Sequence, residues 1–224
     1  MKLKFILIAG FSVACTLFLS AQLSALGLGV YGTGSKSSTT WTYHKNEVPD
    51  FHIKSSDSKM GAGFVLDTNL AKDNLFNYRL NIGFAKITLD NEKTSYSSFY
   101  GIKDITGYEY HLYNTFGFGI VRTEEIRLWI GPQIGFGVIR GEYDLSSGQD
   151  NDFTTIFFSG ALAAGMNVNI GDIVTFGFDA GYRLKQHWGG ASVGNPSFGI
   201  TGKERELYAN VSFILRINDF FPTY

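Results

Sequence analysis

Ionisable side chains recur at alternate positions in segments whose other positions are apolar. Between residues 174 and 184, Asp179 and Arg183 share one side of the segment with Thr175 and two glycines, and the other side is apolar. Side chains of this type could form ion pairs, line a polar pathway or transfer protons. Seven candidates share this parity in their own segments: Arg79, Glu109, His111, Arg127, Asp179, Arg183 and Arg216.

A histidine with a nearby serine could support acyl transfer. His187 lies in the run between residues 182 and 190, and Ser192 follows on a predicted loop. Acyl transfer needs a hydroxyl positioned against its base. Gly189 stands two residues after His187, and nothing in the sequence fixes the position of Ser192. We therefore expect no catalytic residues and no enzymatic activity.

Metal and cofactor motifs are weak. His44 and His52 lie near Asp50 and Asp57 in a polar stretch, without a regular ligand spacing, so a solvated segment is favoured over a metal site. The glycines between residues 27 and 32 match a dinucleotide-type spacing only in part and precede no helix. The sequence therefore predicts neither a metal nor a cofactor.

The first 25 residues have the parts of an export signal. Lys2 and Lys4 precede an apolar run over residues 5–19, and small residues follow. This order is typical of a secretory signal peptide, with cleavage expected after Ala21 or after Ala25. Cys15 is the only cysteine and lies inside this segment, so we expect a mature chain without a thiol. Residues 26–224 form one predicted domain.

Composition narrows the class of protein. The 19 basic and 20 acidic residues give a formal net charge of −1, and no basic cluster indicates nucleic-acid binding. Beyond the signal, no apolar stretch is long enough for a membrane-spanning helix. The 27 glycines and the 16% aromatic content favour a β-protein with close strand contacts.

Eight segments have a hydrophobic period of two, which is typical of strands. They are residues 26–31, 60–66, 76–85, 105–120, 126–138, 156–168, 174–184 and 207–217. Pro132 falls inside the fifth, where we expect a bulge or kink because proline has no amide hydrogen to donate. Asn114 is a polar residue on the apolar side of the fourth, and Ile214 is an apolar residue on the polar side of the eighth.

The predicted connections alternate in length. Residues 32–59, 88–104, 141–152 and 186–203 form long ones, and residues 67–75, 121–125 and 171–172 form short ones. Outer-membrane barrels have short periplasmic turns, longer external loops and, with an even strand number, both ends on the periplasmic side. The alternation therefore favours such a barrel over a soluble sandwich.

These observations predict an all-β, eight-stranded antiparallel up-and-down transmembrane β-barrel. A lysine or arginine facing lipid at mid-membrane costs about 2–4 kcal/mol, and the seven charged candidates take the opposite parity. The interior of an eight-stranded barrel is just wide enough for side chains to fill. We therefore expect the seven to form a buried ion-pair network, with a narrow polar pathway or catalysis as alternatives.

The pattern resembles the small eight-stranded outer-membrane barrels of diderm bacteria, the OmpA, OmpX and Opa class. The last strand, Leu207-Tyr-Ala-Asn-Val-Ser-Phe213, is similar to the C-terminal signal read by the barrel-assembly machinery, although the chain continues to Tyr224. The resemblance implies a monomer exported to the bacterial outer membrane, in contact with its lipid and with the assembly machinery.

Three functions follow as expectations. The leading one is a structural or adhesin-like role, with long loops that present Trp41, Tyr43, Tyr96, Phe99 and Tyr100 to an extracellular ligand. The second is a lipid-modifying enzyme, since the region of His187 faintly resembles the motif strand of lipid A deacylases. The third is a small polar channel. A soluble lipocalin-like barrel would need the opposite polarity.

Overall fold

The computed structural model describes residues 26–45, 48–68, 75–94, 102–145, 150–171, 173–192 and 197–217. The expected signal peptide and the aromatic residues Tyr96, Phe99 and Tyr100 lie outside these ranges. Eight strands make up the described chain: β1 (Gly27–Lys45), β2 (Val48–Asp67), β3 (Phe76–Thr94), β4 (Ile102–Arg122), β5 (Ile126–Leu145), β6 (Asp150–Ile170), β7 (Val174–Ser192) and β8 (Ser197–Arg216). The described residues include no helix with the length and apolar character needed to span a membrane.

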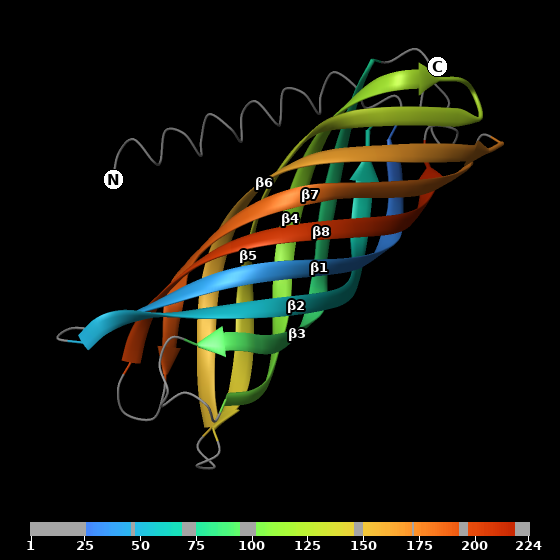
Figure 1. Cartoon of the computed structure of the whole chain (residues 1–224). Helices are drawn as coiled ribbons and strands as arrows, with labels where there is room; N and C mark the ends of the chain where they lie inside the picture. The colour runs from blue at the N-terminus through green and yellow to red at the C-terminus, as the bar shows by residue number, and fades with distance from the viewer. Residues whose placement is uncertain are drawn as a thin grey trace, which may run out of the picture.

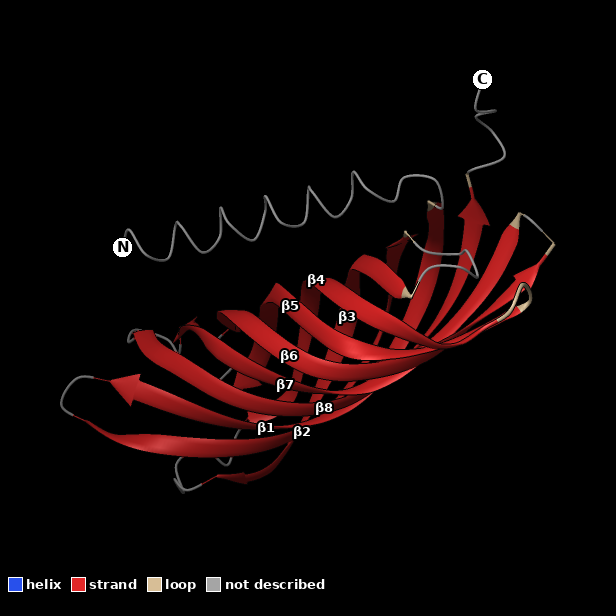
Figure 2. Cartoon of the chain, turned by 90° about the horizontal axis from the view of Figure 1, so that it is seen from above, coloured by secondary structure: helices blue, strands red, loops and turns tan. Residues whose placement is uncertain are grey.

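The strands form a closed barrel in which each pairs antiparallel with its neighbours in the chain, and β8 pairs with β1 (Figures 1 and 2). The fold is an eight-stranded up-and-down antiparallel barrel, which confirms the predicted class. Closure leaves no free sheet edge, so the main chain can cross a bilayer with its hydrogen bonds made internally.

The register fixes the tilt of the strands. Starting at Gly34 of β1 and following paired residues through β2 to β8 leads back to His44 of β1. The circuit is therefore offset by ten residues, so each strand climbs by just over one residue relative to the one before it. Such an offset requires strands tilted by about 45° to the barrel axis. Figure 1 shows the strands running obliquely around the barrel.

The strands are longer than the sequence analysis predicted. Residues 32–59, taken as a long loop, form the parts of β1 and β2 that lie farthest from the chain ends, at the lower left in Figure 1, and these parts stay paired up to Lys45 and Val48. The other three predicted long loops also consist largely of strand. In these extensions both faces carry polar residues, as in Ser35-Lys-Ser-Ser-Thr-Thr40. The hydrophobic period on which the prediction depended is therefore absent there.

The ends of the barrel differ. Short turns join β4 to β5 and β6 to β7, and Thr123 closes the first with hydrogen bonds to Ile126. In the second, Gly171 has a φ of 58°, a conformation that favours glycine. At this same end the amide of Ile217 donates to the carbonyl of Leu26 at 3.0 Å. The described ends of the chain therefore meet at the short-turn end.

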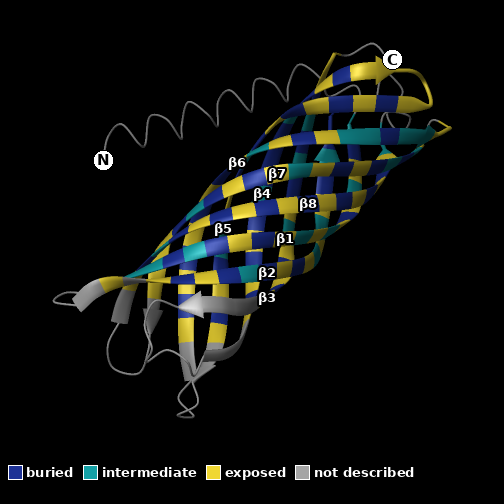
Figure 3. Cartoon of the chain, viewed as in Figure 1, coloured by how far each residue is buried: buried dark blue, intermediate teal, exposed yellow. Residues whose placement is uncertain are grey.

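Buried and exposed residues alternate along every strand (Figure 3). The exposed set forms an apolar belt around the outer wall. It includes Leu28, Phe64, Phe84, Phe118, Phe136, Leu162, Phe178, Leu184, Leu207 and Val211. Because a strand tilted by about 45° climbs about 2.3 Å per residue, the register spreads the backbones of these ten residues over about 18 Å of height, and their side chains extend the belt further. The belt is therefore close in height to the apolar band of about 25 Å in barrels that span a bilayer.

Two anomalies of the sequence have local explanations. The expected bulge at Pro132 is wrong: Pro132 is exposed, pairs in register with Leu162, and the β4–β5 pairing continues on both sides of it without a shift. The two shifts in that pairing lie between Lys103 and Thr106 and between Gly119 and Val121 instead. Asn114 faces outward as expected, and its side-chain oxygen accepts a hydrogen bond of 2.6 Å from the Tyr78 hydroxyl on β3.

Candidate functional site

The polar groups most able to do chemistry fill the inside of the barrel in two clusters. We call the first the lower cluster: Asp67, Arg79, Asn167, Asp179 and Asn210. Arg79 donates to Asp67 through Nε and Nη2, at 3.0 and 2.8 Å, and to Asp179 through Nη1 at 2.8 Å. Its Nη2 also donates to Asn167 at 2.8 Å, and Asn210 donates to Asp179 at 2.7 Å. One guanidinium thus connects β2, β3, β6 and β7 across the lumen.

The upper cluster lies toward the long-strand end, which is at the lower left in Figure 1. It balances three cations against three carboxylates: Lys59, Lys185, Arg183, Glu109, Glu204 and Glu206. The Lys59 ammonium lies 2.8 Å from Glu109 and 2.6 Å from Glu204. Lys185 lies 2.8 Å from Glu109 and 3.2 Å from Glu206. All six side chains are buried. Buried charges require partners of opposite sign, and this cluster supplies them in equal number.

Arg183 is held on every side. Its Nη1 donates to Glu206 at 2.5 Å, and its Nε and Nη2 donate to the Gln133 side-chain oxygen at 3.1 and 2.7 Å. Its guanidinium lies 3.6 Å from the ring centre of Tyr113 and 4.0 Å from that of Tyr208. A guanidinium between two aromatic faces gains cation–π attraction. These contacts fix Arg183 in place. Its side chain therefore occupies the centre of the lumen and obstructs the passage of an ion.

The two lumen histidines connect this cluster to aromatic side chains. His111 stacks on Tyr113 with ring centres 4.6 Å apart, and its Nε2 lies 2.7 Å from the Tyr31 hydroxyl. His187 Nε2 lies 2.9 Å from Glu204, and its ring is 5.0 Å from that of Trp41. Each histidine thus lies between a carboxylate and aromatic rings.

Aromatic side chains close the lumen above the upper cluster. Trp41 meets Phe153 edge to face at 6.5 Å, and Phe157 lies 5.6 Å from His187. A cavity of about 10 Å³ remains beside Trp41 and Lys59, which is about the room needed for one water molecule. The lumen is therefore filled by side chains at three successive levels.

The seven predicted lumen residues are placed as follows. Arg79 and Asp179 meet in the lower cluster, Glu109 and Arg183 meet in the upper one, and His111 lies 3.3 Å from Glu109 beside it. Arg127 is buried near the short-turn end, where it donates to the carbonyl of Leu75 at 3.3 Å. Arg216 is half-buried at that end and donates to Thr175 at 3.3 Å. The structure thus gathers four of the seven into the two clusters and places a fifth, His111, against the upper one.

Sequence reasoning left out four members of the upper cluster. Lys59 fell in a segment predicted to be a loop, and Lys185, Glu204 and Glu206 fell between the predicted strands and the predicted loop 186–203. The signal that could have found them is parity: Lys185 continues the inward series of Asp179 and Arg183 directly after the predicted segment 174–184. Glu204 and Glu206 likewise precede Tyr208 on the inward side of β8.

Two expectations about rim residues are wrong. Trp41, expected on an exposed loop, is buried inside β1, and Tyr43 also belongs to this strand. Strand pairing brings these positions into the wall of the barrel. His44 lies 2.9 Å from Asp50, and His52 lies 2.9 Å from Thr42, on paired strands. No group of three or more potential metal ligands occurs among the described side chains.

The chain has little sequence similarity to known proteins. No family model matches the chain, and no curated protein matches it. Among solved structures, AlkL is 13% identical over 89% of this chain and 92% of its own, with a TM-score of 0.45. OprG of Pseudomonas aeruginosa is 12% identical over 82% and 95%, with a TM-score of 0.41. Neisserial surface protein A is 14% identical over 81% and 96%, with a TM-score of 0.33.

The first two of these structures are described as outer membrane proteins and the third as a surface protein. Identities and TM-scores this low carry no functional argument. The fold assignment therefore depends on the strand pairing of this chain, and the finer resemblance to OmpA, OmpX and Opa stays a prediction.

Proposed function

We propose that this chain is an integral outer-membrane β-barrel protein with a structural or surface-interaction role, and that it is neither a channel nor an enzyme. The observation that carries the proposal is its inverted polarity. Side chains such as Phe64, Phe84 and Leu207 face outward, whereas Arg79, Glu109 and Arg183 are buried inside. A water-soluble barrel would gain from the opposite arrangement, and a bilayer favours this one.

The position of the chain ends supports an orientation. Leu26 and Ile217 meet at the short-turn end, which corresponds to the periplasmic side of an even-stranded outer-membrane barrel. The long-strand end would then extend beyond the outer leaflet. Its outward side chains, such as Thr42, His44 and His52, are the ones available to an extracellular partner.

The filled lumen supports a role without transport. An ion crossing the barrel would have to separate Arg79 from its two carboxylates and then pass the upper cluster and the aromatic side chains. Breaking a buried ion pair costs about 3–5 kcal/mol, and this path breaks several.

The catalytic alternative lacks support at His187. This histidine faces the lumen, where it contacts Glu204 and two aromatic rings, whereas a lipid substrate would lie against the outer wall. We expect a His187→Ala variant to leave the acylation of outer-leaflet lipid unchanged in mass spectra of extracted lipid. A change in acylation that depends on His187 would favour the enzyme.

Membrane fractionation combined with heat-dependent gel mobility tests the barrel and its location. We expect the chain in the outer-membrane fraction, with unheated protein migrating apart from boiled protein. Release without detergent would overturn the proposal.

Planar bilayer recording tests the closed lumen. We expect no steady current from the reconstituted chain at voltages at which a porin, incorporated in the same way, conducts. Stepwise currents from the chain would contradict the proposal and favour a small polar channel.

A further inference from the structure

The outer wall carries six cations just above the apolar belt, which we call the basic collar: Lys36, Lys54, Lys86, Arg140, Lys203 and Arg205. All six are exposed. No ion pair joins any of them to a side chain within the described ranges. They differ in this respect from the lumen cations, each of which has at least one fixed partner. The collar is therefore free to bind something outside the chain.

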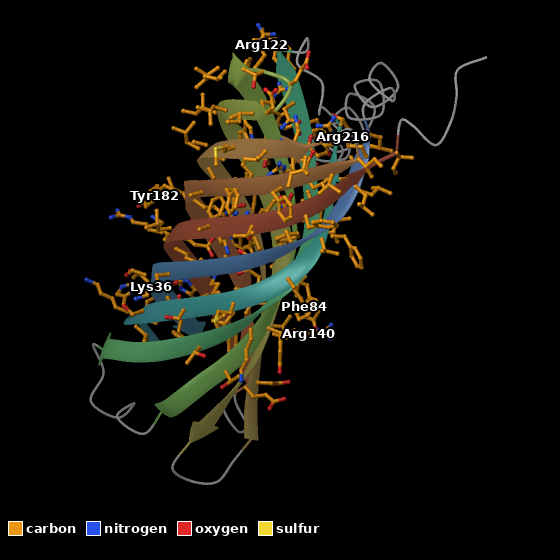
Figure 4. The ribbon with its side chains drawn as sticks, turned by 90° about the vertical axis from the view of Figure 1, so that its right-hand side faces the viewer. Lys36, Phe84, Arg122, Arg140, Tyr182 and Arg216 are labelled. Atoms are coloured by element: carbon orange, nitrogen blue, oxygen red, sulfur yellow. The ribbon has the colours of Figure 1, made fainter. Side chains whose placement is uncertain are left out.

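The register places these cations at similar heights, although they belong to five strands. With the ten-residue offset, all except Lys54 fall within about 8 Å along the barrel axis, given about 2.3 Å of climb per residue. Lys54 lies higher than the other five, by about the spacing of one outward-facing side chain to the next along a strand. On β2, β3 and β8 these heights lie just above the last exposed apolar residues of the belt, Met60, Phe84 and Leu207, and on β6 and β7 the exposed Ile156 and Trp188 reach the height of the collar itself. In Figure 4, Lys36 and Arg140 lie near Phe84 along the barrel, and Arg122 and Arg216 lie toward the other end.

Four of the cations share one face formed by β2, β1 and β8. Thr40 of β1 pairs with Lys54 on one side and with Lys203 on the other. Ser38, two residues earlier, pairs with Arg205 and with Ser56. Paired side chains lie about 5 Å apart at Cβ. Hydroxyl groups thus alternate with cations across this face, which is a suitable arrangement for binding phosphate oxygens.

A smaller pair repeats the arrangement on the other side of the barrel. Lys86 and Arg140 both pair with Tyr108, from β3 and β5 respectively. The exposed acids Glu142 and Asp152 lie above this level by the same register argument. Positive charge is thus concentrated at the height where an apolar belt gives way to headgroups, and negative charge begins above it.

We propose that the basic collar binds the phosphate groups of anionic lipid headgroups in the outer leaflet. This inference rests on the proposed function, because it requires the belt to lie in a bilayer with the long strands outward. Lipid phosphates are fixed at the edge of the hydrocarbon, and the belt holds the collar at that depth. A soluble anion has no such constraint, so the matching heights favour a lipid.

The test uses the full chain refolded into phosphatidylcholine vesicles that contain a small fraction of spin-labelled diphosphoryl lipid A. The readout is the fraction of label immobilised at the protein surface. We expect at least tenfold stronger association than for spin-labelled lipid A stripped of its phosphates, weakened by salt. Inorganic phosphate at the same concentration should not displace the label.

The decisive variant combines Lys36→Gln, Lys54→Gln, Lys203→Gln and Arg205→Gln. Each cation removed should weaken association about fivefold, so the single Lys203→Gln variant already tests the proposal. The control Arg122→Gln removes an exposed cation at the opposite end and should change nothing. Equal association of both lipids with the unaltered chain, or an equal loss in the control, would overturn the inference.

Failure of this inference is distinguishable from failure of the proposed function. If the chain inserts with heat-dependent mobility and yet shows no preference for phosphate, only the inference about the basic collar is wrong. A chain that does not insert sinks the membrane assignment as well.

Discussion

The contribution of an individual lumen residue to the free energy of unfolding depends on its partners. Arg79 satisfies Asp67 and Asp179 at once, so its removal would leave two buried carboxylates without their cation. Removing an arginine that is exposed to water leaves no buried carboxylate without its cation.

We expect Arg79→Met to lower the free energy of unfolding by about 3–5 kcal/mol, the usual cost of breaking a buried ion pair. Urea unfolding in lipid vesicles measures this change. The matched control is Arg122→Met at the exposed short-turn rim, which should stay within about 0.5 kcal/mol. Equal losses for the two variants would show that the lower cluster is not a buried network.

At the scale of the strand, inward-facing glycines leave room for the large side chains that fill the lumen. Gly165 of β6 faces inward, and a Cβ there would come within 2.5 Å of the Trp129 ring. Gly160 of the same strand faces outward, and a Cβ there would meet nothing within 4 Å. The two positions share a strand and differ only in the side they face.

We predict that Gly165→Ala lowers the free energy of unfolding by about 1–3 kcal/mol, because the added methyl overpacks the lumen. Gly160→Ala should be neutral or slightly stabilising, since it adds apolar surface to the lipid face. Thermal loss of the unheated gel form compares the two directly. A larger effect at Gly160 would reverse the assignment of inside and outside for β6.

For the whole molecule, we expect closure and membrane insertion to depend on the belt, whereas the long-strand end extends beyond it. The β1–β2 hairpin continues for several residue pairs above Lys36. These pairs carry polar residues on the outer wall and therefore gain nothing from lipid.

Replacing residues 43–51 by a two-residue turn should accordingly leave an inserted barrel with heat-dependent mobility. The deletion joins Thr42 to His52, which already pair, so the register below is kept. Gel mobility in vesicles provides the measurement, with the full chain as reference. Loss of the inserted form would place the determinants of closure in the hairpin rather than in the belt.

The sequence by itself determined the strand number, the antiparallel order and the side that each belt residue faces. Those features follow from a period of two against lipid, because every misplaced charge there is costly. It also placed Arg79, Asp179, Glu109 and Arg183 on the inward side.

Only the tertiary structure decided the length of the strands and the membership of the upper cluster. Beyond the belt both faces of a strand are polar, so no hydrophobic period marks Lys59 or Glu204 as strand residues. Which inward charges meet depends on the ten-residue offset around the barrel. That offset arises from pairing between all eight strands, and no single segment of sequence contains it.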